Sequence, residues 1–178
     1  MSRGYSFILL IFWAVPTYGL NLSSMEFEKF PACAVKILQK YPGKILSIEA
    51  EQSKNNQLHY EFDIYVPQSR RIFEIECNPE DLSLTDIEEE IKPHDQRFLS
   101  RNPIGVESAE RLALKGIKGK IVSREFSIQQ NSILYEFDIL LDDNLEVEVE
   151  IDAQTGKILE REIEIFSVGY DIPSDINY

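Results

Sequence analysis

The pentapeptide Tyr-Glu-Phe-Asp-Ile at residues 60–64 recurs unchanged at residues 135–139, an offset of 75. Two further matches are colinear with it. Gly-Lys-Ile at 43–45 matches 119–121, and Phe-Glu-Ile-Glu at 73–76 corresponds to Val-Glu-Val-Glu at 147–150. The offset drifts by one residue from match to match, as expected when strands are kept and turns vary in length. The chain therefore contains two copies of one structural unit.

Each copy begins with apolar residues at helical spacing and continues with strict alternation of apolar and acidic residues. The helical faces comprise Phe30, Cys33, Ala34, Ile37, Leu38 and Tyr41 in the first copy, and Val106, Ala109, Leu112, Ala113 and Ile117 in the second. Alternation at 60–66, 73–77 and 145–152 predicts strands with one buried and one wet face, which is typical of antiparallel sheets. We therefore expect an α+β fold of two tandem units, each with one helix packed on a three- to four-stranded antiparallel meander.

The domain plan follows from this repeat and from the N-terminal residues. We expect a signal peptide at 1–19, repeat 1 at 20–92, a linker at 93–105, repeat 2 at 106–166 and a tail at 167–178. Arg3, the nine apolar residues 7–15 and Gly19 fit a cleavable export signal. The alternative is a retained anchor, but so short a run falls below the roughly 20 residues that span a bilayer. A secreted or periplasmic location without a membrane span in the mature chain is predicted.

Charge and motif content narrow the functional class. A net charge of −13 disfavours binding to nucleic acid or to an anionic membrane surface. The chain has two histidines, His59 and His94, and neither lies in a recognisable catalytic or metal-binding motif. We therefore predict a non-enzymatic protein with no catalytic residues, no cofactor and no metal site.

The two cysteines form a candidate disulfide. The helical pattern places Cys33 on a buried face, and strand alternation points Cys77 inward. In the repeat alignment these positions correspond to Ala109 and Ile151, both of core type. A Cys33–Cys77 bridge is expected in an oxidising compartment. The alternative is a pair of buried free thiols that act as small apolar side chains.

An acidic stripe in the second copy is a candidate contact face. It comprises Glu146, Glu148, Glu150 and Asp152 on one strand and Glu160, Glu162 and Glu164 on the next. If these strands pair around Gly156, like charges oppose one another and destabilise the sheet. A basic partner or a divalent cation would relieve that repulsion, whereas the alternative is a solvated edge that blocks aggregation.

The closing hairpin of the second copy, Ile-Asp-Ala-Gln-Thr-Gly-Lys-Ile at 151–158, and Gly-Lys-Ile-Val-Ser at 119–123 resemble the PepSY domain. The first copy departs from this pattern, with Cys-Asn-Pro-Glu-Asp-Leu at 77–82 in place of the hairpin turn. The resemblance implies a small α+β fold of exported proteins and an inhibitory or chaperone-like role toward peptidases. The tandem arrangement is also architecturally similar to beta-lactamase inhibitory protein.

These features favour an exported, non-catalytic binding protein of the PepSY type that inhibits or chaperones an extracytoplasmic peptidase. One alternative is an envelope-associated structural or adaptor protein that binds another protein without inhibiting it. A second alternative is a hydrolase with an unrecognised site.

Overall fold

The computed structural model describes residues 29–169 of the chain. The predicted signal peptide at 1–19 and residues 170–178 of the predicted tail lie outside this part. No helix among the described residues is both long enough and apolar enough to cross a lipid bilayer.

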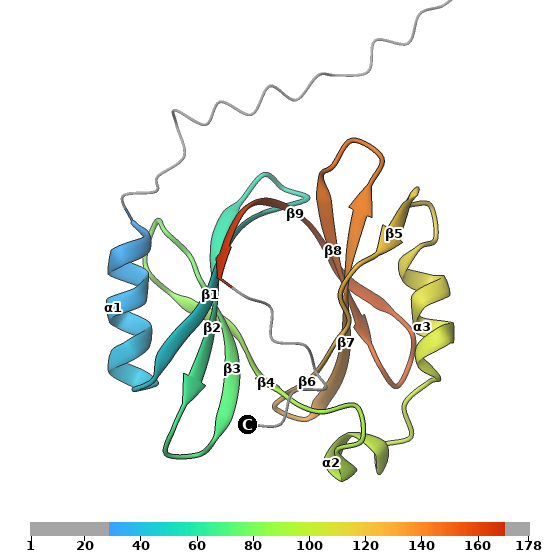
Figure 1. Cartoon of the computed structure of the whole chain (residues 1–178), viewed down its shortest axis with the longest axis horizontal. Coiled ribbons are helices and arrows are strands. Elements are labelled where there is room, and N and C mark those ends of the chain that lie inside the picture. Colours follow the sequence, from blue (N-terminus) through green and yellow to red (C-terminus); the bar gives the residue numbers. More distant parts are fainter. Residues whose placement is uncertain (1–28, 170–178) are drawn as a thin grey trace, which may run out of the picture.

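Strands make up most of the described chain, and a helix precedes each group of them (Figure 1). The first group consists of α1 (Phe30–Lys40), β1 (Lys44–Ser53), β2 (Leu58–Val66), β3 (Arg71–Cys77) and β4 (Leu84–Glu90). After the short helix α2 (Gln96–Leu99), the second group consists of α3 (Val106–Ala113), β5 (Gly119–Ile121), β6 (Glu125–Gln129), β7 (Ser132–Leu141), β8 (Glu146–Asp152) and β9 (Ile158–Gly169).

All strands belong to one antiparallel sheet that closes on itself. Its order is β5-β7-β6-β4-β3-β2-β1-β9-β8, and β8 also pairs with β7. Eight strands thus form a closed barrel, while β5 pairs with the end of β7 beyond β6. The prediction of two separate helix-and-meander units was wrong. If one copy stood alone, the edge strands of its sheet would expose unpaired backbone N–H and C=O groups. In the structure the other copy forms hydrogen bonds with these groups through the β4–β6 and β1–β9 pairings.

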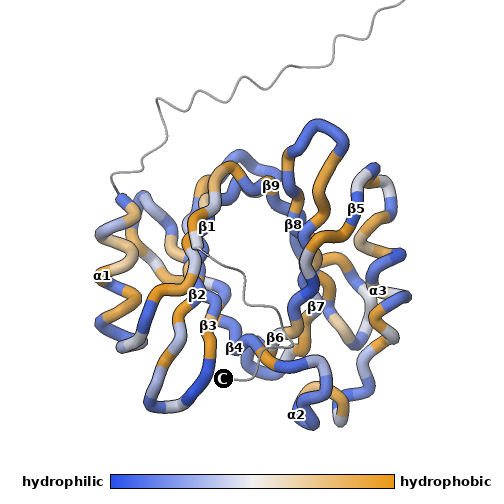
Figure 2. The backbone as a smooth tube through the Cα atoms, in the orientation of Figure 1, coloured by the Kyte–Doolittle hydropathy of each residue, from blue (hydrophilic) through white to orange (hydrophobic). Residues whose placement is uncertain are grey.

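The barrel has its apolar cores on the outside, one beneath each long helix. The repeated pentapeptide occupies equivalent places in them. Residues 60, 62 and 64 of β2 lie in the core that contains Cys33 and Ile37 of α1. Residues 135, 137 and 139 of β7 lie in the core that contains Ala109 and Ala113 of α3. Figures 1 and 2 show α1 and α3 packed against opposite outer sides of the sheet.

Helix α2 lies within the segment predicted as a linker. Its Phe98 is almost fully buried and meets Phe126 and Tyr135 edge to face, with ring centroids 5.6 and 5.3 Å apart. The side chain of Asp95 accepts a hydrogen bond from Arg97 N at 2.8 Å and caps this helix. The connection between the copies therefore contributes to the second core.

Candidate functional site

The predicted acidic stripe lies on the inner face of the barrel. Val147, Val149 and Ile151 of β8 pack outward against the second core, so alternation directs the intervening acids inward. Strand β9 pairs with β8 around Gly156, and the acids face one another as Glu146–Glu164, Glu148–Glu162 and Glu150–Glu160. The structure thus brings these six residues together, but along an interior rather than on a flat outer surface.

Asp152, the remaining residue of the predicted stripe, is the last residue of β8, and its side chain binds the turn that leads to β9. Its Oδ1 accepts hydrogen bonds from Gln154 N at 3.0 Å, Thr155 N at 2.7 Å and Thr155 Oγ1 at 2.9 Å. Gly156 follows with a φ of +73°, a conformation that glycine adopts readily. The Asp152 side chain therefore holds the hairpin closed.

The first copy contributes a matching set of inward acids. Glu61 of β2 and Glu74 of β3 are 7% and 6% exposed, because they alternate with core residues of the same strands. Further inward carboxyl groups on the described strands include Glu49, Glu51, Asp63, Glu76, Glu88 and Glu90 in the first copy and Glu125, Glu136 and Asp138 in the second. The alternation was visible in the sequence of both copies. What it did not reveal is the curvature that turns the wet face of each sheet into a shared interior.

Burial and mutual repulsion together perturb these carboxyl groups. Burial, followed by the charges of neighbouring acids, raises the pKa values of Glu61, Glu136 and Glu148 well above the ordinary range. The same two causes raise the pKa of Glu150 to about 8. The interior thus favours the protonated form of these carboxyl groups.

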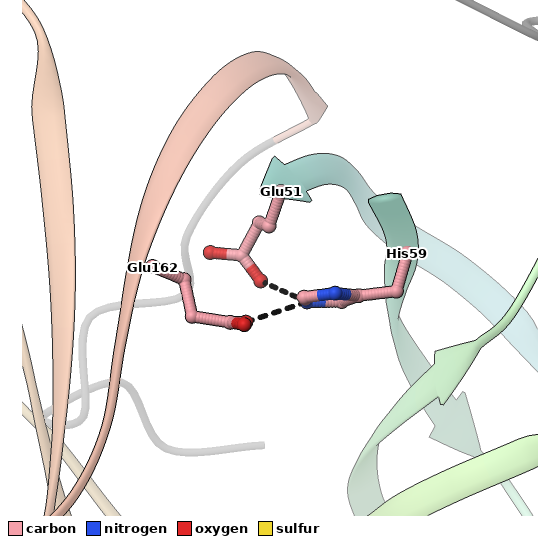
Figure 3. Close-up of side chains that lie close together, drawn as sticks. All are labelled: Glu51, His59 and Glu162. Atoms are coloured by element: carbon pink, nitrogen blue, oxygen red, sulfur yellow. Dashed lines mark hydrogen bonds and ion pairs between the residues drawn. The ribbon is translucent and has the colours of Figure 1, made fainter. Parts of the chain in front are cut away.

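His59 lies in this acidic interior near the start of β2, beside the end of β1 and the middle of β9 (Figure 3). His59 Nε2 is 3.0 Å from Glu51 Oε2, 2.6 Å from Glu162 Oε2 and 3.9 Å from Glu76 Oε1. Burial lowers the pKa of His59, but the hydrogen bonds with Glu162 and Glu51 and the charge of Glu76 outweigh it and raise the pKa to about 11. Sequence reasoning gave His59 no role, because Glu51 and Glu162 are far apart in the chain and meet only through the β1–β9 pairing.

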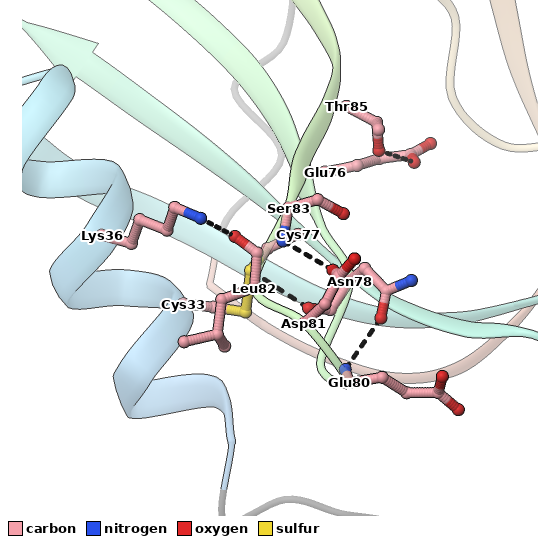
Figure 4. Close-up of a disulfide and its surroundings, with 10 residues drawn as sticks. All are labelled: Cys33, Lys36, Glu76, Cys77, Asn78, Glu80, Asp81, Leu82, Ser83 and Thr85. Carbon is pink, nitrogen blue, oxygen red and sulfur yellow. Dashed lines mark hydrogen bonds between the residues drawn. A yellow bond between two sulfur atoms is a disulfide. The ribbon is translucent and has the colours of Figure 1, made fainter.

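The predicted disulfide is confirmed. Cys33 of α1 and Cys77 at the end of β3 are bonded, with Cα atoms 5.9 Å apart (Figure 4). The Lys36 amino group donates a hydrogen bond to Leu82 O, and Asn78 N donates one to Ser83 O at 3.0 Å. The loop that departs from the hairpin pattern of the second copy is therefore attached to α1 both covalently and by hydrogen bonding.

A cavity of about 530 Å³ lies between the β2–β3 turn and α2. It contains His94 beside residues of both charges. Its Arg71 and Arg97 both bind Glu89, at 3.0 and 2.8 Å. The charges in this cavity are therefore largely engaged with one another.

The outer face of β9 carries an apolar stripe that neither long helix covers. Val168 and Phe166 pair with Ile48 and Ala50, which face outward, and Ile163 pairs with Val147 of the second core. Val168 is 54% exposed, Phe166 is 41% exposed and Ile163 is 40% exposed. We call Ile163, Phe166 and Val168 the β9 stripe. In Figure 1, β9 spans the space between the two helix-covered sides.

The inner face and the β9 stripe differ in the kind of ligand that each could accept. The partners of His59 are carboxyl groups, and both cysteines are used in the disulfide. The inner face can hold protons or a cation, and the β9 stripe can hold an apolar surface. Neither arrangement pairs a nucleophile with a base.

Comparison with known proteins identifies the family of this chain. Residues 33–88 and 103–162 each match the model of PepSY, described as the peptidase propeptide and YPEB domain. No curated protein matches the chain. A crystal structure of a candidate lipoprotein from Clostridium difficile 630 is similar, with 15% identity, a TM-score of 0.34, and coverage of 76% of this chain and 93% of that one. The architectural likeness to beta-lactamase inhibitory protein is not shown by these comparisons and stays a prediction.

Proposed function

Since the chain belongs to the PepSY family, we propose that it acts outside the cytoplasm as a non-catalytic binding protein for a peptidase, which it inhibits or helps to fold. The family description, which names peptidase propeptides, supports the choice of partner. The location is supported by the export-type residues 1–19 and by the Cys33–Cys77 disulfide, since such bonds persist in oxidising compartments.

The β9 stripe is the observation that carries this proposal. Three apolar side chains on one strand face exceed the scattered exposure that is ordinary at protein surfaces, and such groups favour protein–protein contact. The acidic stripe cannot fill a partner's cleft as a flat face, because the sheet curves around it. The partner would therefore dock on the outer surface along β9, and the closed barrel would provide a rigid support.

The test measures two effects of the purified protein on secreted metallopeptidases of the thermolysin type. The first is residual hydrolysis of a fluorogenic peptide, and the second is the yield of active enzyme after refolding from denaturant. We expect the wild-type protein to lower the first or raise the second at a saturating molar ratio. Ile163→Glu and Phe166→Glu should abolish the effect, because each places a charge in the apolar contact.

Val35→Glu is the matched control. Val35 is an exposed apolar residue of α1, 58% accessible and away from β9, so this variant should behave as wild type. Binding that leaves both hydrolysis and refolding unchanged would favour the adaptor role. Equal loss of effect in Val35→Glu and Ile163→Glu would remove the β9 stripe from the proposal.

A further inference from the structure

We propose that the inner face holds a divalent transition-metal ion, with Glu51, His59 and Glu162 as its protein ligands. This inference is independent of the peptidase proposal. It contradicts our prediction from the sequence that the chain has no metal site. The reason for the difference is that the three residues come from β1, β2 and β9, which only the closed sheet brings together.

The geometry of the three side chains fits a metal centre. One ligand atom from each residue lies within 4.8 Å of the other two. In a tetrahedral site, metal–nitrogen and metal–oxygen bonds of about 2.1 Å place neighbouring ligand atoms roughly 3.4 Å apart. His59 Nε2 lies 3.0 Å from Glu51 Oε2 and 2.6 Å from Glu162 Oε2, so a metal ion needs the three side chains to move apart by less than about 1 Å. Figure 3 shows both carboxyl groups converging on the imidazole edge.

A buried oxygen without a partner provides the second observation. Glu51 is 1% exposed, and its Oε1 has no hydrogen-bond partner. Glu61 and Glu148 each place an oxygen within 4.8 Å of a Glu51 oxygen, so further carboxyl oxygens surround this side chain. An unsatisfied oxygen of a buried carboxylate is costly, and metal coordination is one of the ways in which proteins satisfy it.

The histidine proton satisfies this cluster only in part. A protonated His59 can share its Nε2 hydrogen between Glu51 Oε2 and Glu162 Oε2, but this contact leaves Glu51 Oε1 unsatisfied. A divalent ion in place of that proton would supply one more positive charge and can bind a carboxylate through both oxygens. Binding would then release protons, because imidazole and carboxyl groups coordinate metals in their deprotonated forms.

The ligand set indicates the class of metal. Imidazole nitrogen suits Zn²⁺ and its transition-metal neighbours, whereas Ca²⁺ and Mg²⁺ prefer sites made of oxygen atoms alone. Access is available at the rim of the site, where the side chains of His59 and Glu76 retain 11% and 17% of their exposure. We therefore choose Zn²⁺ as the probe.

Calorimetric titration of ZnCl₂ into the chelator-treated protein at pH 7.5 tests this site. We expect one bound ion per chain with proton release that varies with the ionisation enthalpy of the buffer. His59→Gln and Glu162→Gln should each weaken binding by about 100-fold or more, because even outer-shell partners of metal ligands account for 10–100-fold. The matched controls, His94→Gln and Glu80→Gln, replace the other histidine and an exposed acid in the loop after β3, and both should bind as wild type.

X-ray absorption of the zinc-loaded wild-type protein provides a readout that needs no variant to fold. We expect one imidazole and two or more oxygen ligands, and no sulfur. Failure to bind Zn²⁺ with one-to-one stoichiometry would overturn the proposal. It would also be overturned if His94→Gln abolished binding, or if Ca²⁺ bound more tightly than Zn²⁺ and was indifferent to His59→Gln.

Discussion

The two halves of the barrel have the same framework but attach their helices differently. In the first half the Cys33–Cys77 disulfide joins α1 to the end of β3. The corresponding residues of the second half, Ala109 and Ile151, are fully buried and only pack in the second core. The second half is stabilised instead by the segment that connects the two copies, since Tyr135 Oη donates a hydrogen bond to Ile104 O at 2.7 Å. A duplicated sequence can therefore keep its strands while each copy evolves its own way to hold the helix.

The halves are joined by two strand pairings, β4–β6 and β1–β9, which we call seams. These two seams differ as well. At the β4–β6 seam, Glu88 accepts hydrogen bonds from the Ser127 hydroxyl and from Gln129 Nε2, which lies 3.0 Å from Glu88 Oε1. At the β1–β9 seam, Glu51 and Glu162 converge on His59. Neutral donors thus contact the buried acid at the first seam, whereas an imidazole, which can coordinate a metal ion, contacts the buried acids at the second.

The largest expected effect comes from truncating the equivalent phenylalanines of the repeated pentapeptide. Phe62→Ala and Phe137→Ala each remove a fully buried ring and should lower the free energy of unfolding by roughly 3–5 kcal/mol. Because the halves share one closed sheet, both variants should still unfold in a single transition, measured by circular dichroism in urea. A biphasic curve in either variant would show that the halves unfold as separate units.

Removing the disulfide should have an effect nearly as large. Cys33→Ala combined with Cys77→Ile gives the first half the residues of the second. The bridge spans a sequence separation of 44, and its loss should cost about 4 kcal/mol in the chain-entropy model. Denaturation in urea with and without dithiothreitol measures this cost. Reductant should destabilise the wild type but leave the double variant unchanged, and an equal response of both proteins would contradict the explanation.

Glu88, the buried acid at the β4–β6 seam, should make the stability of the fold depend on pH in an unusual way. Burial raises the pKa of Glu88 from 4.5 to about 7, although the hydrogen bond from Ser127 opposes the shift. Between these values the folded state binds more protons than the unfolded state, so the free energy of unfolding falls as pH rises from about 4.5 to about 7. We expect Tm at pH 8 to lie several degrees below Tm at pH 5.

Glu88→Gln should reduce this drop in Tm, because the amide has no proton to lose. Glu80→Gln, which changes an exposed acid in the loop after β3, should leave the pH profile as in the wild type. Differential scanning fluorimetry across the pH range compares the three proteins. Identical profiles would assign the pH dependence to other inner-face acids.

The smallest effect concerns the surface ion pair that attaches α3. Arg124 Nε lies 2.5 Å from Glu110 Oε1, and the two side chains are 46% and 25% exposed. Arg124→Ala should lower the free energy of unfolding by about 0.5 kcal/mol, as is typical of solvated pairs. Urea denaturation at low and high salt checks this, since added salt should reduce the difference in the free energy of unfolding between the variant and the wild type. A loss above about 2 kcal/mol would show that α3 depends on this pair as α1 depends on its disulfide.

Several features were predictable because they depend on local sequence. The spacing of apolar residues places α1 and α3, and alternation identifies the inward and outward faces of β2 and β8. The repeat alignment matched Cys33 and Cys77 to core positions of the other copy, which made the disulfide predictable. The matches at 33–88 and 103–162 confirm that both copies are PepSY regions.

Other features were not predictable because they require distant residues to meet. Phe98 was missed because a single buried ring in a proline-containing connection has no periodicity to identify it. His59 was missed as a site residue because alternation gives its face but not its neighbours across the β1–β9 seam. The acids of β8 and β9 were placed on the correct side of their strands, yet that side was taken as an outer surface.

The sequence by itself determined the duplication, the alternation that separates apolar from acidic faces, and the cysteine pair, since each depends on residue spacing within one copy. The tertiary structure decided how the copies combine. Pairing of β4 with β6 and of β1 with β9 closes the sheet, because free strand edges leave backbone hydrogen bonds unsatisfied. That closure buries the acids together and brings Glu162 to His59.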